Sequence, residues 1–170
     1  MKLIVSPLID LDRQLAKHAP AGVVSLLSPG HEAPPLTGDP PRLVLRFHDI
    51  AEPAEGLTLV TERQVDMLLT FAAGFAPHAC LLLHCWMGIS RSPAAAFVLA
   101  CAGAPPGAEA KIARALRAAS PSATPNPRLV ALADARLDRE GRMSRAAAAI
   151  GRGVEASIGA AFALDLEALA

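Results

Sequence analysis

The sequence predicts an α/β protein with a central mixed sheet flanked by helices and a helical C-terminal half. Short apolar segments alternate with amphipathic ones in the first part of the chain, and only helical patterns follow. The 170 residues, 52% hydrophobic and 19% charged, are enough to bury one core without disulfides or metals. We therefore expect a single compact domain over residues 1–170, although residues 151–170 show too little periodicity to be placed.

Four apolar segments are expected to form the strands. The first is followed by Pro7, and because proline cannot donate a ladder hydrogen bond we expect this strand at an edge of the sheet. The last is apolar on both faces, which is typical of a central strand covered by helices. The expected strands are residues 3–5, 22–27, 42–47 and 80–84.

Helices are expected where apolar residues recur at helical spacing, and several carry residues that favour helix ends. Thr61 and Gln64 have the spacing of a capping box. Asn126 and Pro127 suit an N-cap and the first helical position, and Pro93 suits a first turn, where its missing N–H costs nothing. The expected helices are residues 10–18, 61–75, 91–103, 108–119, 126–139 and 142–150.

Charge and cysteine content argue against several classes of protein. The formal net charge is zero, so nothing favours binding to nucleic acid or to an anionic membrane. Cys80 and Cys85 would lie about 16 Å apart on one strand, too far for a disulfide, and no Cys-x-x-Cys pair suggests a metal site. No apolar segment reaches the ~20 residues of a membrane-spanning helix, and the N-terminal one is too short for a secretory signal. We therefore expect a cytoplasmic protein without a metal.

The most informative stretch joins the predicted central strand to the helix after it. It contains His84 and Cys85, five further residues, and then Arg91 and Ser92. A helix N-terminus offers free N–H groups and positive dipole, so an anion can bind there, and a thiol in such a place is favoured as the nucleophilic thiolate. The guanidinium of Arg91 matches two oxygens of a phosphate. Together these groups suit attack on a phosphate ester.

A bare Cys-x5-Arg is weak evidence, because in this composition it arises by chance about one time in five. The additional His84, Gly88 and Ser92 and the strand-to-helix context make the match specific. The pattern resembles the signature of the cysteine-dependent protein tyrosine and dual-specificity phosphatases, and the short chain is similar to small bacterial tyrosine phosphatase-like proteins. The resemblance implies a phosphotyrosine protein phosphatase-like fold and phosphate monoester hydrolysis through a cysteinyl-phosphate intermediate, with no cofactor.

The resemblance also implies roles for the residues of the motif. Cys85 is the expected nucleophile, and Arg91 is expected to bind phosphate oxygens and to stabilise the charge of the transition state. Backbone N–H groups of the loop are expected to surround the phosphate, with Gly88 allowing the turn. The loop residues in this substrate-binding set are Trp86, Met87, Gly88, Ile89 and Ser90.

The two polar neighbours of these residues each have two interpretations. The resemblance implies that His84 helps to hold the loop and to keep the thiol ionised, so we expect it in the substrate-binding set; a hydrogen-bonded core histidine is equally compatible with its position, and both can hold together. Ser92 corresponds to the hydroxyl that helps the thiolate leave when the intermediate breaks down, and a helix-capping serine is the alternative.

A general acid is needed because an alkoxide or phenoxide leaves poorly without a proton. In dual-specificity-like phosphatases this is an Asp some thirty-odd residues before the Cys. Asp49 lies 36 residues before Cys85, directly after a predicted strand, and is the expected acid. The alternative for Asp49 is a turn-capping carboxylate. Asp39, in the proline-rich loop 28–41, is the second candidate, and Glu52 and Glu55 are weaker ones.

The substrate is expected to be a phosphorylated protein or a small phosphate ester. Residues 86–90 contain no Lys or Arg, whereas a multiply phosphorylated head group would require more cations than Arg91. This favours phosphotyrosine or another phosphoprotein. Two alternatives stay open: a catalytically weak phosphopeptide-binding module, and a phosphatase of a small phosphorylated metabolite. The sequence does not indicate an oligomeric state.

Overall fold

The computed structural model describes residues 1–169, and its centre is one five-stranded sheet with the strand order β3-β2-β4-β1-β5. The first four strands in the chain are parallel, and β5 pairs antiparallel with β1. The sheet is therefore mixed, as the sequence predicts. The strands are β1 (Lys2–Pro7), β2 (Gly22–Leu27), β3 (Arg42–Arg46), β4 (Cys80–Cys85) and β5 (Phe162–Asp165).

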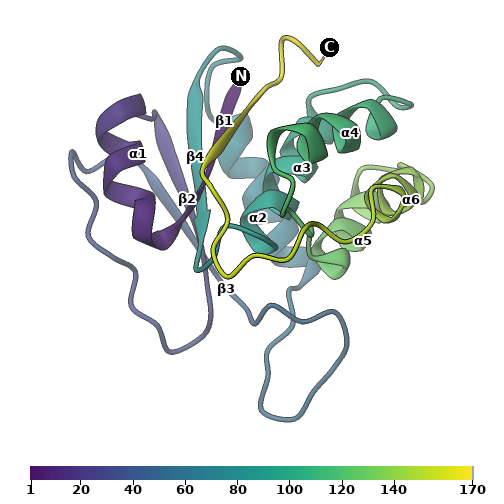
Figure 1. Cartoon of the computed structure of the whole chain (residues 1–170), viewed down its shortest axis with the longest axis horizontal. Coiled ribbons are helices and arrows are strands. Elements are labelled where there is room, and N and C mark those ends of the chain that lie inside the picture. Colours follow the sequence, from purple (N-terminus) through teal and green to yellow (C-terminus); the bar gives the residue numbers. More distant parts are fainter. Residues whose placement is uncertain (170) are drawn as a thin grey trace.

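Helices cover both faces of this sheet (Figure 1). One face packs on α1, with Leu11 and Leu15 of the helix against Leu82 of β4. On the other face, Leu83 and Cys85 belong to the larger core, which the remaining helices complete. The helices are α1 (Leu11–His18), α2 (Glu62–Ala73), α3 (Arg91–Ala102), α4 (Glu109–Ala119), α5 (Pro127–Arg136) and α6 (Arg142–Ala149).

The most buried helix is α3, in which every residue from Arg91 to Cys101 is buried. Its alanines allow the sheet and the surrounding helices to approach closely, and Phe97 fills the centre of the contact. This burial fixes the N-terminus of α3 directly behind the end of β4. Within residues 1–169, no helix combines the length and the apolar character needed to cross a membrane.

The prediction that the first strand lies at an edge is wrong. Lys2 to Val5 pair with β5, whose strand was not predicted, so that β1 lies inside the sheet. Pro7 does not prevent this pairing because it lies at the end of β1, beyond the residues that β5 contacts. The chain after α6 is thus placed: residues 151–161 are irregular, and the helical half returns to the sheet at its end.

The predicted helix starts are confirmed. Thr61 and Gln64 form both hydrogen bonds of a capping box at α2. The Asn126 side chain accepts a hydrogen bond of 2.9 Å from the Leu129 N–H, and Pro127 is the first residue of α5. Several helices end up to three residues earlier than expected, because their last hydrogen bonds lead into turns, as where the Leu137 N–H donates to the Ala133 carbonyl at 2.9 Å after α5.

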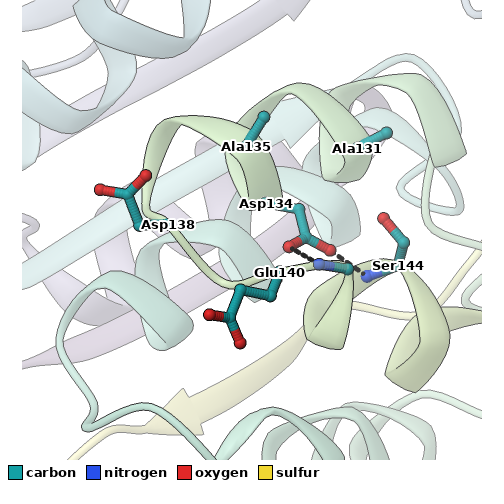
Figure 2. A pocket seen from close by; sticks show the side chains of 7 residues that line it. Ala131, Asp134, Ala135, Asp138, Glu140 and Ser144 are labelled. Atoms are coloured by element: carbon teal, nitrogen blue, oxygen red, sulfur yellow. Dashed lines mark hydrogen bonds between the residues drawn. The ribbon is translucent and has the colours of Figure 1, made fainter.

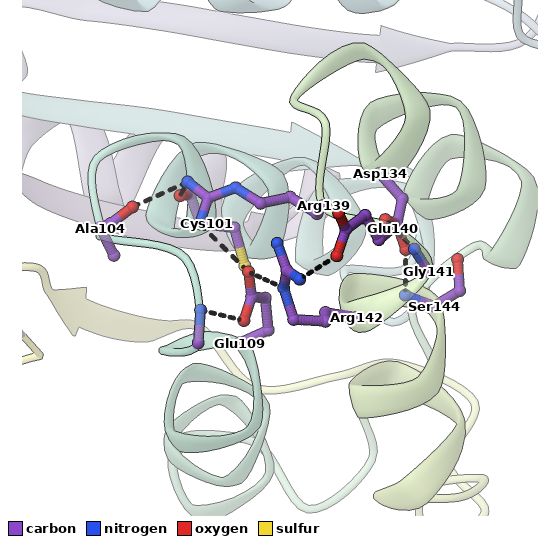
Figure 3. A network of polar contacts seen from close by, with 10 residues as sticks. Cys101, Ala104, Glu109, Asp134, Arg139, Glu140, Gly141, Arg142 and Ser144 are labelled. Atoms are coloured by element: carbon purple, nitrogen blue, oxygen red, sulfur yellow. Dashed lines mark hydrogen bonds and ion pairs between the residues drawn. The ribbon is translucent and has the colours of Figure 1, made fainter.

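A buried ionic network joins α4 to the turn between α5 and α6 (Figure 3). Arg139 pairs with Glu109 at 3.1 Å and donates to the Cys101 and Ala104 carbonyls, each at 2.7 Å, at the end of α3. Both charged side chains are less than 10% exposed (7% for Arg139 and 3% for Glu109). This arrangement connects three helices through one guanidinium, which adds a donor to carbonyls at and just after the C-terminus of α3.

Candidate active site

The loop between β4 and α3 reverses direction in a narrow space beside β1. Gly88 lies in this loop with φ +70°, a conformation that favours glycine. A Cβ at this position would lie 2.7 Å from the Pro7 nitrogen. Both the backbone angle and the close approach therefore require glycine here, in agreement with the turn predicted for Gly88.

The sulfur of Cys85 lies at the base of this loop and accepts two hydrogen bonds. One comes from the Gly88 N–H at 3.3 Å and the other from the Ser92 hydroxyl at 3.1 Å. Both groups are donors, which solvate negative charge on a sulfur. The other cysteines differ, since burial raises the pKa of Cys80 and raises that of Cys101 to about 12. Of the three thiols, only Cys85 has the surroundings of a nucleophile.

Arg91 is buried at the first position of α3 and is held by two oxygens from other segments. Its Nη1 donates to the Phe47 carbonyl at 3.0 Å and to the Ser28 hydroxyl at 3.1 Å. Its Nε is also buried and has no hydrogen-bond partner within residues 1–169. The guanidinium is thus fixed on one side while its other donors stay available to an oxyanion. Ser28 was not predicted, because no sequence pattern links it to the motif.

Of the four carboxylates considered as general acid, Asp49 is tied to the loop. Its Oδ1 accepts hydrogen bonds from the Ser90 hydroxyl at 2.7 Å and from the Asn126 Nδ2 at 2.8 Å. Both donors reach the same oxygen, so Oδ2 remains without a partner among residues 1–169. Asp39 lies exposed in the loop 28–41 and makes no hydrogen bond or ion pair with the described residues. Geometry therefore favours Asp49.

Asn126 links three segments that meet at the site. Besides Asp49, its Nδ2 contacts the Ile50 carbonyl at 3.4 Å, and its backbone N–H donates to the Ser90 carbonyl at 3.4 Å. Its Oδ1 caps α5. The sequence predicts only the cap. No residue pattern indicates that Asn126 also contacts Asp49, which lies 77 positions away in the sequence.

His84 lies on the opposite face of the sheet from Cys85, because successive strand residues alternate. Its Nε2 shares a hydrogen bond of 2.7 Å with the Ser25 hydroxyl, to which Arg42 also donates. Burial, with the charge of Arg42, lowers the pKa of His84 to about 3. The ring is therefore neutral at physiological pH, and its hydrogen bond to Ser25 is the one expected of a core histidine.

The outer side of the loop is apolar. Trp86 is 49% and Met87 40% exposed, and the Trp86 ring lies edge-on to His31 at 5.3 Å between centroids. No Lys or Arg is present between Cys85 and Arg91. Trp86 and Met87 thus expose an aromatic and an aliphatic side chain beside the candidate phosphate-binding loop.

A cavity of about 460 Å³ between α5 and α6 holds several acidic side chains but has a structural explanation (Figure 2). Asp134 is buried, and its two carboxylate oxygens accept the N–H groups of Gly141 at 2.8 Å and Ser144 at 2.7 Å. It therefore caps the start of α6. Residues 1–169 contain no group of three or more His, Cys, Asp or Glu placed to hold a metal ion.

Solved structures similar to this chain are phosphatases. DUSP15 matches with a TM-score of 0.61 and 22% identity over 85% of each chain. Human DUSP28 matches with a TM-score of 0.58 and 18% identity, covering 84% of this chain and 94% of that one. The Yvh1 phosphatase domain from Chaetomium thermophilum has a TM-score of 0.58 and 17% identity, with 83% and 93% covered.

At this level of identity the similarity establishes the fold. No family model matches the sequence, and no curated protein matches it significantly. The mixed five-stranded sheet and its helices match the fold of these structures. The chain thus has the fold of the dual-specificity phosphatases, which are cysteine-dependent protein tyrosine phosphatases.

Proposed function

We propose that this protein hydrolyses phosphate monoesters through a cysteinyl-phosphate intermediate. The observation that carries the proposal is the placement of a hydrogen-bonded Cys85 sulfur in the same loop as the fixed guanidinium of Arg91. A nucleophile and a bidentate oxyanion site joined by a loop of backbone N–H groups suit phosphoryl transfer and little other chemistry. The fold shared with dual-specificity phosphatases supports the same conclusion.

In the first step, the Cys85 thiolate attacks phosphorus while the bond from phosphorus to the leaving oxygen breaks. Arg91 binds two of the equatorial oxygens and stabilises the charge on them. Asp49 donates a proton to the leaving oxygen from Oδ2, since Ser90 and Asn126 occupy Oδ1. The products are the alcohol or phenol and a phosphoryl group on the Cys85 sulfur.

In the second step, water attacks the phosphoryl group and the bond from sulfur to phosphorus breaks. The Asp49 carboxylate, now deprotonated, accepts a proton from this water. The Ser92 hydroxyl, 3.1 Å from the sulfur, donates a hydrogen bond to the departing thiolate. Inorganic phosphate and the starting form of the enzyme result.

The substrate that suits this surface is a monophosphate ester with an apolar neighbour, such as phosphotyrosine in a protein. The exposed Trp86 and Met87 can contact an aromatic ring, and the absence of further cations beside Arg91 disfavours multiply charged head groups. The thiolate mechanism also requires a reducing compartment, which supports the cytoplasm as the location.

The test is hydrolysis of an aryl phosphate and an alkyl phosphate between about pH 5 and 8. We expect Cys85→Ser to be inactive and Asp49→Ala to lose rate, most strongly on the alkyl phosphate, whose leaving group needs the proton more. If Asp49→Ala keeps the full rate on both, the acid is another residue. A wild type that binds phosphate without turnover would instead support the phosphopeptide-binding module, and turnover of small phosphorylated metabolites but not phosphopeptides would support the metabolite phosphatase.

A further inference from the structure

The carbonyls of the phosphate-binding loop, residues 86–90, accept hydrogen bonds from separate parts of the chain. A loop that turns its N–H groups inward turns its carbonyls outward, where each needs a donor. The Trp86 carbonyl accepts from the Leu8 N–H at 3.1 Å, and the Ile89 carbonyl from the Thr124 N–H at 2.8 Å. The Met87 carbonyl accepts from the N–H of Gly159 at 2.9 Å.

Gly159 belongs to the segment after α6, which is anchored on both sides of this contact. Before it, the Gly153 N–H donates to the Thr124 hydroxyl at 3.0 Å, and the Val154 N–H to the Pro121 carbonyl at 2.9 Å. After it, β5 pairs with β1. Residues 153–165 are therefore held against the phosphate-binding loop by contacts on both sides of Gly159 as well as by the Gly159 hydrogen bond itself.

The contact at Gly159 is closer than most side chains would allow. Gly159 is buried, and a Cβ at this position would lie 3.1 Å from the Gly88 carbonyl oxygen and 3.2 Å from the Ile89 Cγ1. Those distances are shorter than an ordinary van der Waals contact, so a side chain here would displace the loop. The backbone of the segment therefore packs directly on the backbone of the loop.

One peptide unit connects this contact to the sulfur. The carbonyl of Met87 and the N–H of Gly88 belong to the same planar trans peptide and point in opposite directions. The carbonyl end accepts from Gly159, and the N–H end donates to the Cys85 sulfur at 3.3 Å. Fixing the carbonyl fixes the direction of the N–H, and a hydrogen bond to the carbonyl also polarises the N–H beyond it.

We propose that Gly159 is a positioning residue of the active site: its N–H orients the Met87–Gly88 peptide so that the Gly88 N–H points at the Cys85 sulfur and at a bound phosphate. This inference rests on the proposed function of Cys85 as the nucleophile. Two charged residues contact neighbouring parts of the site, Arg91 through the Phe47 carbonyl and Asp49 through the Ser90 hydroxyl, and both stay unchanged in the variants that test it.

The test compares two proline variants. Gly159→Pro removes the donor, whereas Ala156→Pro places a proline at an exposed position of the same segment, where the N–H has no partner among residues 1–169. The first readout is the pH midpoint of alkylation of Cys85 by iodoacetamide, with the site identified by mass spectrometry. The second is the dissociation constant of inorganic phosphate, and thermal unfolding reports folding.

We expect Gly159→Pro to move the alkylation midpoint to higher pH and to weaken phosphate binding about fivefold, the effect of one lost hydrogen bond, while Ala156→Pro matches the wild type. Should Gly159→Pro fail to fold, Gly159→Ala, which keeps the donor and crowds the Gly88 carbonyl, is expected to shift both readouts in the same direction. A folded Gly159 variant with the wild-type midpoint and phosphate affinity overturns the inference. The midpoint is read without substrate, so absence of phosphatase turnover in the wild type is a separate result that overturns only the proposed function.

Discussion

Cys85 differs from the other two cysteines in the groups that surround its sulfur. Cys101 is equally buried, but it lies near Glu109 within a helix, where burial and that negative charge raise its pKa. Cys85 instead lies where a strand ends and a helix begins, so that a backbone N–H and a hydroxyl reach its sulfur. The position of Cys85 at the end of β4 therefore gives its sulfur two hydrogen-bond donors, as a nucleophilic thiolate requires.

Ser92→Ala is expected to slow the second step of the proposed mechanism more than the first, because the hydroxyl donates to the sulfur that would leave when the proposed intermediate breaks down. A lost hydrogen bond to a charged group corresponds to about a 10- to 100-fold decrease in kcat. Rapid-quench kinetics on an aryl phosphate would then show a burst of the released phenol that is followed by slow turnover. Ser92→Thr, which keeps the hydroxyl, serves as the control. Equal slowing of the burst and of turnover would contradict this role.

His84→Gln is expected to make stability less dependent on pH. The pKa of His84 is about 3 in the folded protein, against an ordinary value of 6.5, so below pH 6.5 the unfolded chain binds a proton that the folded protein does not. The wild type therefore loses stability as the pH falls, by about 1.4 kcal/mol per unit from this residue. Urea unfolding at about pH 7 and 5 should show a loss about 2 kcal/mol smaller in His84→Gln. An identical loss in both proteins would show that His84 is charged when folded.

Asn126, at the start of α5, both caps this helix and contacts the loop after β3. Asn126 caps the helix with its side-chain oxygen and holds Asp49 with its side-chain nitrogen. The loop after β3 and the loop after β4 are thus both fixed to one helix. Ser90, the N-cap residue of α3, makes no side-chain capping bond, and its hydroxyl donates to Asp49.

The two functions of Asn126 can be separated by substitution. Asn126→Ser retains an oxygen that can cap α5 but loses the amide that reaches Asp49. We expect its thermal stability to stay near the wild type, and its kcat to fall about tenfold on an alkyl phosphate and much less on an aryl phosphate with a good leaving group. Asn126→Ala, which loses both functions, should also unfold at a lower temperature. Equal losses on both substrates would mean that Asn126 does not act through the acid.

The molecule as a whole depends on the buried network around Arg139, which joins helices remote from the site. Arg139→Leu removes the shorter ion pair of the buried Glu109, leaving Arg142 at 3.6 Å, and takes one donor from two carbonyls at the end of α3. We expect the free energy of unfolding to fall by about 3–5 kcal/mol, measured with urea. Arg136→Ala breaks an exposed pair with Asp66 and should leave stability close to the wild-type value. A loss in Arg139→Leu no larger than in Arg136→Ala would show that the network contributes little.

The fold could be predicted from the sequence where the signal is local. Apolar runs marked four strands, and capping residues marked the starts of α2 and α5. The strand β5 could not be predicted, because four residues in an alanine-rich tail carry no clear alternation and gain their stability from pairing with β1. Since this pairing was not foreseen, β1 was placed wrongly at an edge.

In the candidate site, too, the residues with a local sequence signal could be predicted and those that depend on tertiary contacts could not. Cys85, Arg91 and Ser92 are close in sequence, so one motif indicates them together, and Asp49 is found from its distance to that motif. Ser28, Asn126 and Gly159 reach the site through a tertiary contact or a backbone group, and no residue type marks them. For His84 the structure shows a hydrogen bond to Ser25, which fits the core-histidine interpretation, while its part in holding the loop stays a prediction.

The most direct test of the mechanism is to identify the residue that becomes phosphorylated. The wild type and Ser92→Ala are mixed with an aryl phosphate, quenched with acid, and digested for mass spectrometry. The mechanism predicts one phosphoryl group on the peptide that contains Cys85, more abundant in Ser92→Ala, and none in Cys85→Ser, which should also be inactive. Turnover that persists in Cys85→Ser, or a phosphoryl group on any other residue, would contradict it.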